Sequence, residues 1–280
     1  MNLRRLDAYF RRLVEEGLLP GAVVLVARGG EVVFQGVYGY LDPGRGLPMR
    51  EDALFRRVSM PLRWVAARAR RVVEEGTLSL LDPVEKYLPE FSGLLVGREV
   101  GEGIVYEPLK RPLTVYDLLR HTAGLTYGVF FRSPVKGLYL EAGVDRFDLS
   151  REVFLERLAA LPLRFQPGET FEYGLATDLL GHLLEALAGR SLAELLEERL
   201  FRPLGMKDSG FQAKDPARLA QPFPKDPETG HSLRLLPVET PPPRYAGGMG
   251  GVGTAADYLA FLEALRPGRG ARSPTMAGFM

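Results

Sequence analysis

The sequence predicts an α/β protein of the α+β kind, with an antiparallel sheet flanked by helices and a mostly helical remainder. Two observations support this class: two valine-rich segments surround a glycine turn near the N-terminus, and helical periodicity dominates from about residue 59 onward. With 280 residues and 46% hydrophobic residues, the chain can bury a large core. We expect one domain over residues 1–280, with a helix and a hairpin of the sheet in residues 1–45 and mainly helices in residues 46–265.

The first expected element is a helix over residues 3–16, whose apolar side chains recur on one helical face. This face consists of Leu3, Leu6, Phe10 and Leu13. Residues 21–27 and 31–38 follow as two strands of a hairpin. Arg28, Gly29 and Gly30 join them as a glycine-rich turn, because glycine readily adopts the positive φ angles that hairpin turns need.

The rest of the chain up to residue 265 is expected to be mainly helical. Helices are predicted over residues 59–75, 114–120, 150–161, 176–188, 191–199 and 254–265. Three of them begin with Ser or Thr followed three residues later by an acidic residue, which is the pattern of a capping box. These pairs are Thr114 with Asp117, Ser191 with Glu194, and Thr254 with Asp257. Prolines crowd residues 212–246, so we expect an irregular connection there.

Composition argues against several classes of function. A formal net charge of +1 gives no electrostatic reason to expect a nucleic acid or membrane partner. The chain has no cysteine and no carboxylate and histidine cluster with metal spacing, so we expect no metal and no cofactor. A charged N-terminus without a long apolar run predicts a cytoplasmic protein. Only six of the 36 basic residues are lysines, which indicates a GC-rich or thermophilic source.

Ser59 is the main candidate for a nucleophile. Its segment, Leu54 to Trp64, reads Leu-Phe-Arg-Arg-Val-Ser-Met-Pro-Leu-Arg-Trp. It resembles the S-x-x-K region of the superfamily of serine β-lactamases, D-alanyl-D-alanine carboxypeptidases and family VIII carboxylesterases. In that superfamily the serine is on the first turn of a buried helix, and the lysine three residues later accepts its proton. Here Leu62 stands at the lysine position, and leucine cannot act as a base.

A second motif, Phe-Glu-Tyr-Gly-Leu, ends at Leu175 and resembles the Y-x-N element of the same superfamily. The form Tyr173-Gly174-Leu175 is more similar to family VIII esterases than to β-lactamases, whose asparagine would help to hold an amide. The resemblance implies that the tyrosine, as a phenolate, takes the serine proton and returns it to the leaving group. Without a lysine beside it, a buried Tyr173 should stay protonated and be a poor base.

Three further phrases extend the resemblance along the chain, at residues 118–125, 200–211 and 247–257. With the serine and tyrosine segments they follow the order and spacing of the superfamily. The resemblance therefore implies a β-lactamase/transpeptidase-like fold in which Ser59 and Tyr173 are catalytic. The substrate-binding residues that it implies are Leu62, Gly174, Leu175 and Gly250.

The chain also departs from the superfamily pattern. The helix after Ser59 carries four arginines where the superfamily has small and apolar residues, namely Arg63, Arg68, Arg70 and Arg71. A buried unpaired arginine would cost on the order of several kcal/mol, so this helix must be exposed differently or be damaged. The sequence ends at Met280, where the superfamily continues with strands that carry its third motif. We therefore expect the C-terminal strands and one oxyanion donor to be missing.

Other interpretations of the same patterns have less support. A lone serine at a helix start is usually an N-cap, and a buried tyrosine usually belongs to the core. His121, His182 and His231 do not indicate a Ser-His-Asp triad, because no G-x-S-x-G element is present, and we interpret all three as structural. Residues 248–253 fit G-x-G-x-x-G, but no valine-rich strand precedes them, so we expect no dinucleotide site.

Two functions of different classes follow. The first is a serine hydrolase of the esterase type, which forms an acyl-enzyme at Ser59 and acts on a small-molecule ester or amide. The second is a catalytically inactive or truncated homologue that acts at most as a binding module, and Leu62 favours it. The sequence does not determine the oligomeric state.

Overall fold

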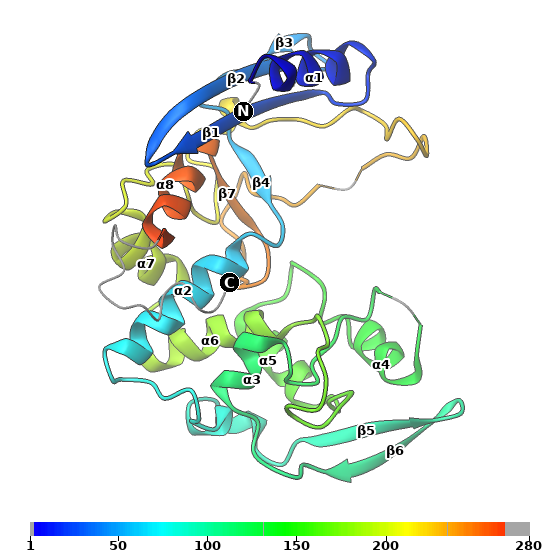
Figure 1. Ribbon diagram of the computed structural model, residues 1–280. Coiled ribbons are helices and arrows are strands. Elements are labelled where there is room, and N and C mark those ends of the chain that lie inside the picture. The colour runs from blue at the N-terminus through cyan, green and yellow to red at the C-terminus, as the bar shows by residue number, and fades with distance from the viewer. Residues whose placement is uncertain (1–2, 131, 234, 267–280) are drawn as a thin grey trace. The chain divides into compact units, whose positions relative to one another are not determined.

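The structure is a computed structural model that describes residues 3–130, 132–233 and 235–266 (Figure 1). These residues form two compact units, each built from separate stretches of the chain. The helical unit contains Val58–Arg199 and Pro242–Met249. The sheet unit contains Leu200–Pro241 and the described residues before Val58 and after Met249. The expectation of one domain with a division near residue 45 stays a prediction.

The sheet unit begins with the helix and the hairpin expected from the sequence. Helix α1 (Leu3–Glu15) precedes the antiparallel strands β1 (Gly21–Arg28) and β2 (Glu31–Asp42) (Figure 1). Gly29 and Gly30 have φ angles of 64° and 91°, which confirms the glycine-rich turn, and Arg28 belongs to β1, where it pairs with Glu31.

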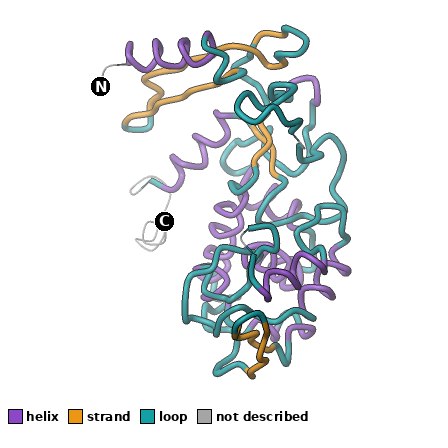
Figure 2. Tube along the Cα trace, turned by 90° about the vertical axis from the view of Figure 1, so that its right-hand side faces the viewer, coloured by secondary structure: helices purple, strands orange, loops and turns teal. Residues whose placement is uncertain are grey.

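Helix α1 packs on this hairpin through an aromatic contact. The rings of Phe10 and Tyr38 are stacked with 5.5 Å between their centroids, and the Tyr38 hydroxyl donates to Asp7 Oδ1 at 3.0 Å. A short strand β3 (Leu47–Pro48) pairs with β2 and gives a sheet of order β1-β2-β3. Figure 2 shows the strands in orange, grouped in three small sheets.

A second, two-stranded sheet of this unit joins distant parts of the chain. Strand β4 (Phe55–Arg57) pairs antiparallel with β7 (Gly251–Gly253), and helix α8 (Ala255–Leu265) follows β7 and contacts β1. A cluster of buried side chains packs around these strands. Its members are Leu54, Ala213, Leu219, Val238 and Val252. Within the expected irregular stretch, residues 212–246, the only helical turn described is a 3₁₀ turn at Pro216–Arg218.

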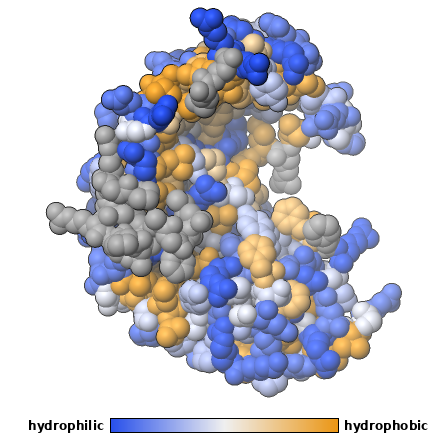
Figure 3. Space-filling view, viewed as in Figure 1, coloured by the Kyte–Doolittle hydropathy of each residue, from blue (hydrophilic) through white to orange (hydrophobic). Residues whose placement is uncertain are grey.

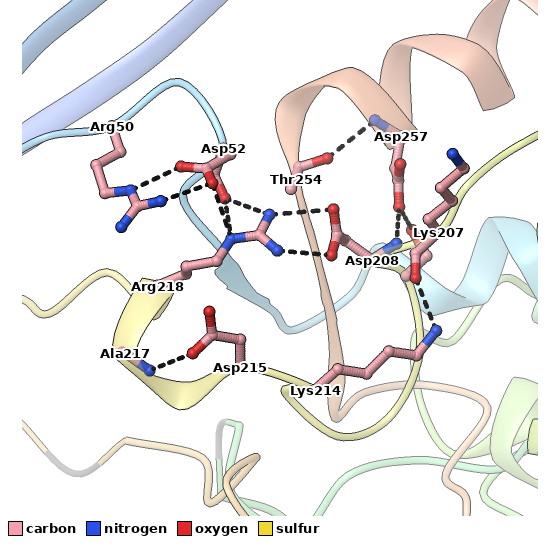
Figure 4. Close-up of polar contacts among 11 residues, drawn as sticks. Arg50, Asp52, Lys207, Asp208, Lys214, Asp215, Ala217, Arg218, Thr254 and Asp257 are labelled. Carbon is pink, nitrogen blue, oxygen red and sulfur yellow. Dashed lines mark hydrogen bonds and ion pairs between the residues drawn. The ribbon is translucent and has the colours of Figure 1, made fainter.

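Charged side chains tie the loops of the sheet unit together (Figure 4). The Arg218 guanidinium binds the Asp208 carboxylate at 2.8 and 3.0 Å and donates to the Asp52 carbonyl at 2.6 and 2.9 Å. Thr254 caps α8 by accepting the N–H of Asp257 at 3.1 Å, as expected. The Asp257 carboxylate does not complete a capping box, because it accepts the N–H of Asp208 at 2.9 Å instead. It therefore links α8 to the loop at residue 208.

The helical unit is organised around one almost fully buried helix. Its helices are α2 (Pro61–Glu74), α3 (Val115–Arg120), α4 (Pro134–Ala142), α5 (Arg151–Ala159), α6 (Ala176–Ala188) and α7 (Leu192–Leu196). Residues Ala176 to Glu185 of α6 are all buried, and α2, α3 and α7 contact this helix (Figure 1). None of the described helices is long and apolar enough to cross a bilayer.

Local capping confirms two of the helix starts in this unit. Thr114 with Asp117 and Ser191 with Glu194 form complete capping boxes at the starts of α3 and α7. Helix α7 ends at Leu196 and continues as a π turn over Glu197–Phe201, whereas the sequence predicted an α-helix to residue 199. Further 3₁₀ turns cover Val84–Lys86 and Pro89–Phe91.

Three elements of the helical unit were not expected from the sequence. Strands β5 (Leu95–Val100) and β6 (Gly103–Pro108) form an antiparallel hairpin, and helix α4 follows later. Helix α4 contains Gly137, which lowers helix propensity. Burial of Val135 and Tyr139, both with 0% exposure, stabilises it instead. The local sequence pattern therefore does not predict this helix.

Helix α2 accommodates its arginines by amphipathic packing. Trp64, Val65, Ala69 and Val72 are buried, and Arg63 is exposed. Arg68, Arg70 and Arg71 form ion pairs with Glu74 or Glu75, with N to O distances of 3.2 to 3.6 Å. Each of these three arginines has a carboxylate partner, although Arg68 Nε and Nη1 are buried and make no hydrogen bond within the described part of the chain. The expectation of a damaged segment stays a prediction.

Candidate active site

Tyr173 lies in the loop that leads into α6. The residue is 37% exposed, so the expectation of a buried tyrosine is wrong. Its ring centroid is 5.0 Å from that of His121 and 5.7 Å from that of Tyr127, within the range of favourable aromatic pairs. Neighbouring rings therefore hold a phenol that still reaches solvent.

The surface beside this tyrosine is rich in exposed aromatic residues. Phe171 is 64% exposed and its ring lies 5.9 Å from that of His121, while Phe130 is 52% exposed and lies 5.6 Å from Tyr127. Figure 3 shows hydrophobic residues, in orange, reaching the surface among hydrophilic ones. A small apolar molecule would find favourable contacts at such a surface.

Gly174 has a packing reason to be glycine. A Cβ at this position would collide with the carbonyl oxygen of Leu125 and lie 2.5 Å from the Cα of Thr126. The next residue, Leu175, is only 1% exposed and belongs to the core. These positions let the tyrosine loop pack closely on residues 125 and 126, and their predicted contact with substrate stays a prediction.

Glu172 anchors the same loop through ion pairs and a hydrogen bond. Its carboxylate lies 2.9 Å from Lys136 Nζ and 2.9 Å from Arg164 Nη1, and it accepts the Thr126 hydroxyl at 2.6 Å. Burial opposes ionisation, but the hydrogen bonds from Thr126 and Lys136 and the charge of Arg164 outweigh it and lower the pKa of Glu172. Glu172 is therefore a charged anchor immediately before Tyr173.

Ser59 is exposed and lies just ahead of α2 rather than on its first turn. The helix begins at Pro61, because proline has a helical φ and needs no N–H partner at the first position. Met60 occupies the N-cap position and makes no side-chain capping bond. Leu62 follows in the first turn and is half-buried, so the position expected for a lysine offers only an apolar side chain.

Gly247 brings the starts of α2 and α6 together within the helical unit. A Cβ at this position would lie 3.4 Å from Val65 Cγ2 in α2 and would collide with the Thr177 carbonyl oxygen in α6. Ser59 lies two residues before α2 and Tyr173 three residues before α6, and their predicted role as a catalytic pair stays a prediction.

A buried charged cluster lies behind the tyrosine loop. Asp178 of α6 pairs with Arg244 at 3.4 Å, and the two side chains are 1% and 2% exposed. The Arg244 guanidinium also lies 4.0 Å above the ring of Phe154. Burial, followed by the charge of Asp178, raises the pKa of Tyr127 above its ordinary value. Tyr127 is therefore a neutral hydroxyl beside Tyr173.

Gly250 belongs to the sheet unit and has a φ of 87°. A Cβ there would meet no atom within 4 Å, so backbone conformation rather than crowding favours glycine. The predicted contacts of Gly250 and Leu62 with substrate stay predictions. The expected end of the sheet near Met280 lies outside the described residues.

Comparisons with known proteins identify the fold and then the family. The fold is β-lactamase/transpeptidase-like: the structure matches EstCE1, described as a hydrolase with promiscuous acyltransferase activity, with a TM-score of 0.82 and 31% identity over 98% of this chain and 75% of EstCE1. Simvastatin synthase (LovD) from Aspergillus terreus matches with a TM-score of 0.77 and 24% identity over 94% of this chain and 68% of that chain, which supports the fold alone.

The family follows from sequence. The model of the beta-lactamase family matches residues 6–278. Esterase EstB from Burkholderia gladioli is 36% identical over 293 aligned positions, which cover 98% of this chain and 72% of EstB. The chain belongs to the beta-lactamase family.

Sequence reasoning missed several residues around Tyr173. His121 was interpreted as merely structural, and Glu172, Lys136 and Asp178 were not singled out. Two signals could have found them: Lys136 is one of only six lysines, and Asp178 is an acidic residue in an otherwise apolar run. The contacts of these residues join positions far apart in sequence, so no local pattern reveals them.

Proposed function

We propose that this protein is a serine hydrolase of the esterase type that acts on small esters through an acyl-enzyme at Ser59. The observation that carries the proposal is the exposed, ring-supported Tyr173 in a loop whose helix meets the helix after Ser59 at Gly247. Two relatives that cover most of this chain, EstB and EstCE1, are described as an esterase and a hydrolase, which supports this reaction class.

In the proposed reaction, Ser59 Oγ attacks the carbonyl carbon of the ester while its proton passes to the Tyr173 phenolate. The resulting phenol then gives this proton to the departing alkoxide, which leaves as an alcohol. In the second half, water attacks the acyl carbon and gives a proton to the phenolate, and Ser59 Oγ leaves and regains that proton. The products are an alcohol and a carboxylic acid.

Esters are favoured over amides by the tyrosine loop. The position two residues after Tyr173 is Leu175, whose buried side chain offers no amide group to hold a substrate amide. An ester needs less assistance, because an alkoxide is a better leaving group than an amide anion.

A catalytically inactive relative that binds small molecules is the second candidate, and Leu62 is the observation that favours it. No amine is available at this position of α2 to assist Tyr173. A phenol acts as a base only when it is ionised, so the hydrolase candidate requires a rate that rises toward alkaline pH.

Hydrolysis of p-nitrophenyl butyrate tests the proposal. We expect measurable turnover that Ser59→Ala abolishes and that Tyr173→Phe lowers by roughly 10²- to 10⁴-fold. Ser92→Ala and Tyr106→Phe, which alter exposed residues of the helical unit far from these loops in sequence, serve as controls and should keep the wild-type rate. Turnover that survives Ser59→Ala would refute the assignment of the nucleophile.

A further inference from the structure

His121 stands out among the helix ends of this protein. Helices α4 and α6 end at Gly143 and Gly189, whose φ angles of 64° and 63° place them in the left-handed region that glycine adopts without strain. Helix α3 ends in the same conformation at His121, with a φ of 54°. Among the described residues, His121 is the only non-glycine residue with a positive φ. The backbone there favours glycine, so the histidine at this position points to a role for its imidazole.

The imidazole and the backbone of His121 both contact the tyrosine loop. Its ring lies 5.0 Å from the Tyr173 ring at an interplanar angle of 35°, and its Nε2 lies 3.3 Å from Thr177 Oγ1 in the first turn of α6. Its carbonyl oxygen accepts the N–H of Glu172 at 2.8 Å. His121 therefore contacts residues before and after Tyr173, and the Tyr173 ring itself.

The electrostatics of His121 suit a side chain that positions the Tyr173 ring rather than one that transfers a proton. Burial lowers the pKa of the imidazole, although the charge of Asp178 opposes this shift. The ring is therefore neutral near pH 7 and adds no charge beside the phenol. A neutral flat ring also packs against another aromatic ring without the cost of desolvating a charge.

We propose that His121 is a positioning residue for Tyr173, which fixes the phenol in the orientation that proton transfer to and from Ser59 requires. The proposal rests on the proposed function of the same site. The contact with Tyr173 is made by the imidazole ring. A glycine at this position would keep the left-handed backbone and lose the contacts of the ring. A displacement of about 1 Å at a catalytic group lowers a rate by up to roughly 10²-fold, so the loss of this contact should be measurable.

His121→Gly separates the side chain from the backbone. This variant keeps the left-handed conformation without strain, and this relief offsets part of the packing lost with the ring, so the melting temperature should fall by at most a few degrees. We expect kcat for p-nitrophenyl butyrate to fall by roughly 10- to 100-fold with little change in KM. His121→Asn also tolerates this conformation and keeps a polar group, and it should recover part of the rate. His231→Gly, which alters an exposed histidine of the sheet unit, is the matched control.

A double-mutant cycle shows whether His121 acts through Tyr173. In the Tyr173→Phe background, His121→Gly should cost little further activity, because the group that it positions is already gone. An equal loss in both backgrounds would overturn the proposal. So would a fall in rate that accompanies a large loss of thermal stability, since that result indicates a merely structural role.

A spectroscopic measurement tests the contact independently of activity. In protein with ¹³C-labelled tyrosine rings, the Tyr173 resonance is assigned by its absence from Tyr173→Phe. It should shift in His121→Gly and stay in place in His231→Gly, because a ring 5.0 Å away contributes to its chemical shift. An unchanged resonance overturns the positioning role even in an active enzyme. If the resonance shifts in His121→Gly but the wild-type protein shows no turnover, the contact between His121 and Tyr173 is supported. That result contradicts the proposed hydrolase function and not the contact.

Discussion

Asp145 is a half-buried carboxylate whose ionisation costs stability. Burial raises its pKa to about 6, and hydrogen bonds from the N–H groups of Gly128 and Val129 only partly oppose this shift. Between the ordinary value near 4 and about 6, the folded state binds more protons than the unfolded state. The free energy of unfolding therefore falls as pH rises through this window.

In the wild type the N–H of Gly128 donates to Asp145 Oδ2 at 2.8 Å. Asp145→Asn removes the charge and keeps an oxygen that can accept this hydrogen bond. The variant should melt a few degrees above the wild type at about pH 8 and lose this advantage near pH 4. Thermal melts at both pH values test this. Asp148→Asn, at an exposed carboxylate, should show no such pH-dependent gain. An equal difference at both pH values would contradict the assigned cause.

Gly174 gives a second prediction at this scale. A methyl group here collides with backbone atoms of residues 125 and 126, which cannot move aside as the end of a flexible side chain could. Gly174→Ala should destabilise the protein by about 1–3 kcal/mol and displace the tyrosine loop. Gly137→Ala is the matched control: it lies within α4 with no atom near its Cβ position and should stabilise by about 0.5–1 kcal/mol. Urea denaturation measures the free energy of unfolding of both variants. An unchanged free energy in Gly174→Ala would show that the tyrosine loop moves to accommodate the methyl group.

At the scale of elements, the first turn of α2 is where a base for the proposed nucleophile Ser59 would lie. Leu62 lies in the first turn, half-buried, where a lysine side chain could extend along the helix surface. The positive end of the helix dipole disfavours an added cation there, which makes a neutral amine more available as a base. Leu62→Lys should therefore raise the acylation rate of Ser59 by at least about 10-fold.

Arg63→Lys is the control for this variant. It places a lysine one residue further on, at an exposed position of the same helix, without changing the charge. Stopped-flow measurement of p-nitrophenol release compares the two. The same rate in Leu62→Lys and in wild type would show that an amine at this position does not reach Ser59.

Elements with strong local signals were predictable from sequence. The Gly29-Gly30 hairpin and the capping boxes at Thr114 and Ser191 are confirmed, because backbone conformation and capping depend on neighbours in the chain. Helix α4 and the hairpin β5–β6 were missed. Burial of Val135 and Tyr139 stabilises α4, and this burial depends on contacts that the local sequence does not encode.

The same distinction holds for the site. Ser59 and Tyr173 could be proposed from motifs, whereas the surroundings of the tyrosine could not. Arg244 pairs with Asp178 across 66 positions, and Gly247 packs against α2 and α6 although it is distant from both in sequence. The exposure of Tyr173 was also wrongly predicted, because a motif states which residue is present but not how much of it the fold covers.

At the scale of the whole molecule, the chain shares its ancestry with the beta-lactamase family. Membership of a family does not by itself establish activity, which depends on the chemistry of the site. Leu62 favours an inactive protein, while the exposed, ring-supported Tyr173 and the contact between helices α2 and α6, which follow Ser59 and Tyr173, favour an active one. Both accounts share one fold. They differ in whether Ser59 is a nucleophile.

Labelling with a fluorophosphonate probe, followed by peptide mass spectrometry, tests this most directly. The reagent reacts covalently with an activated serine and needs no turnover. We predict a single adduct on Ser59 that forms faster at alkaline pH, slows in Tyr173→Phe and is absent from Ser59→Ala. No adduct on Ser59 at any pH, in protein shown to be folded, would contradict the account.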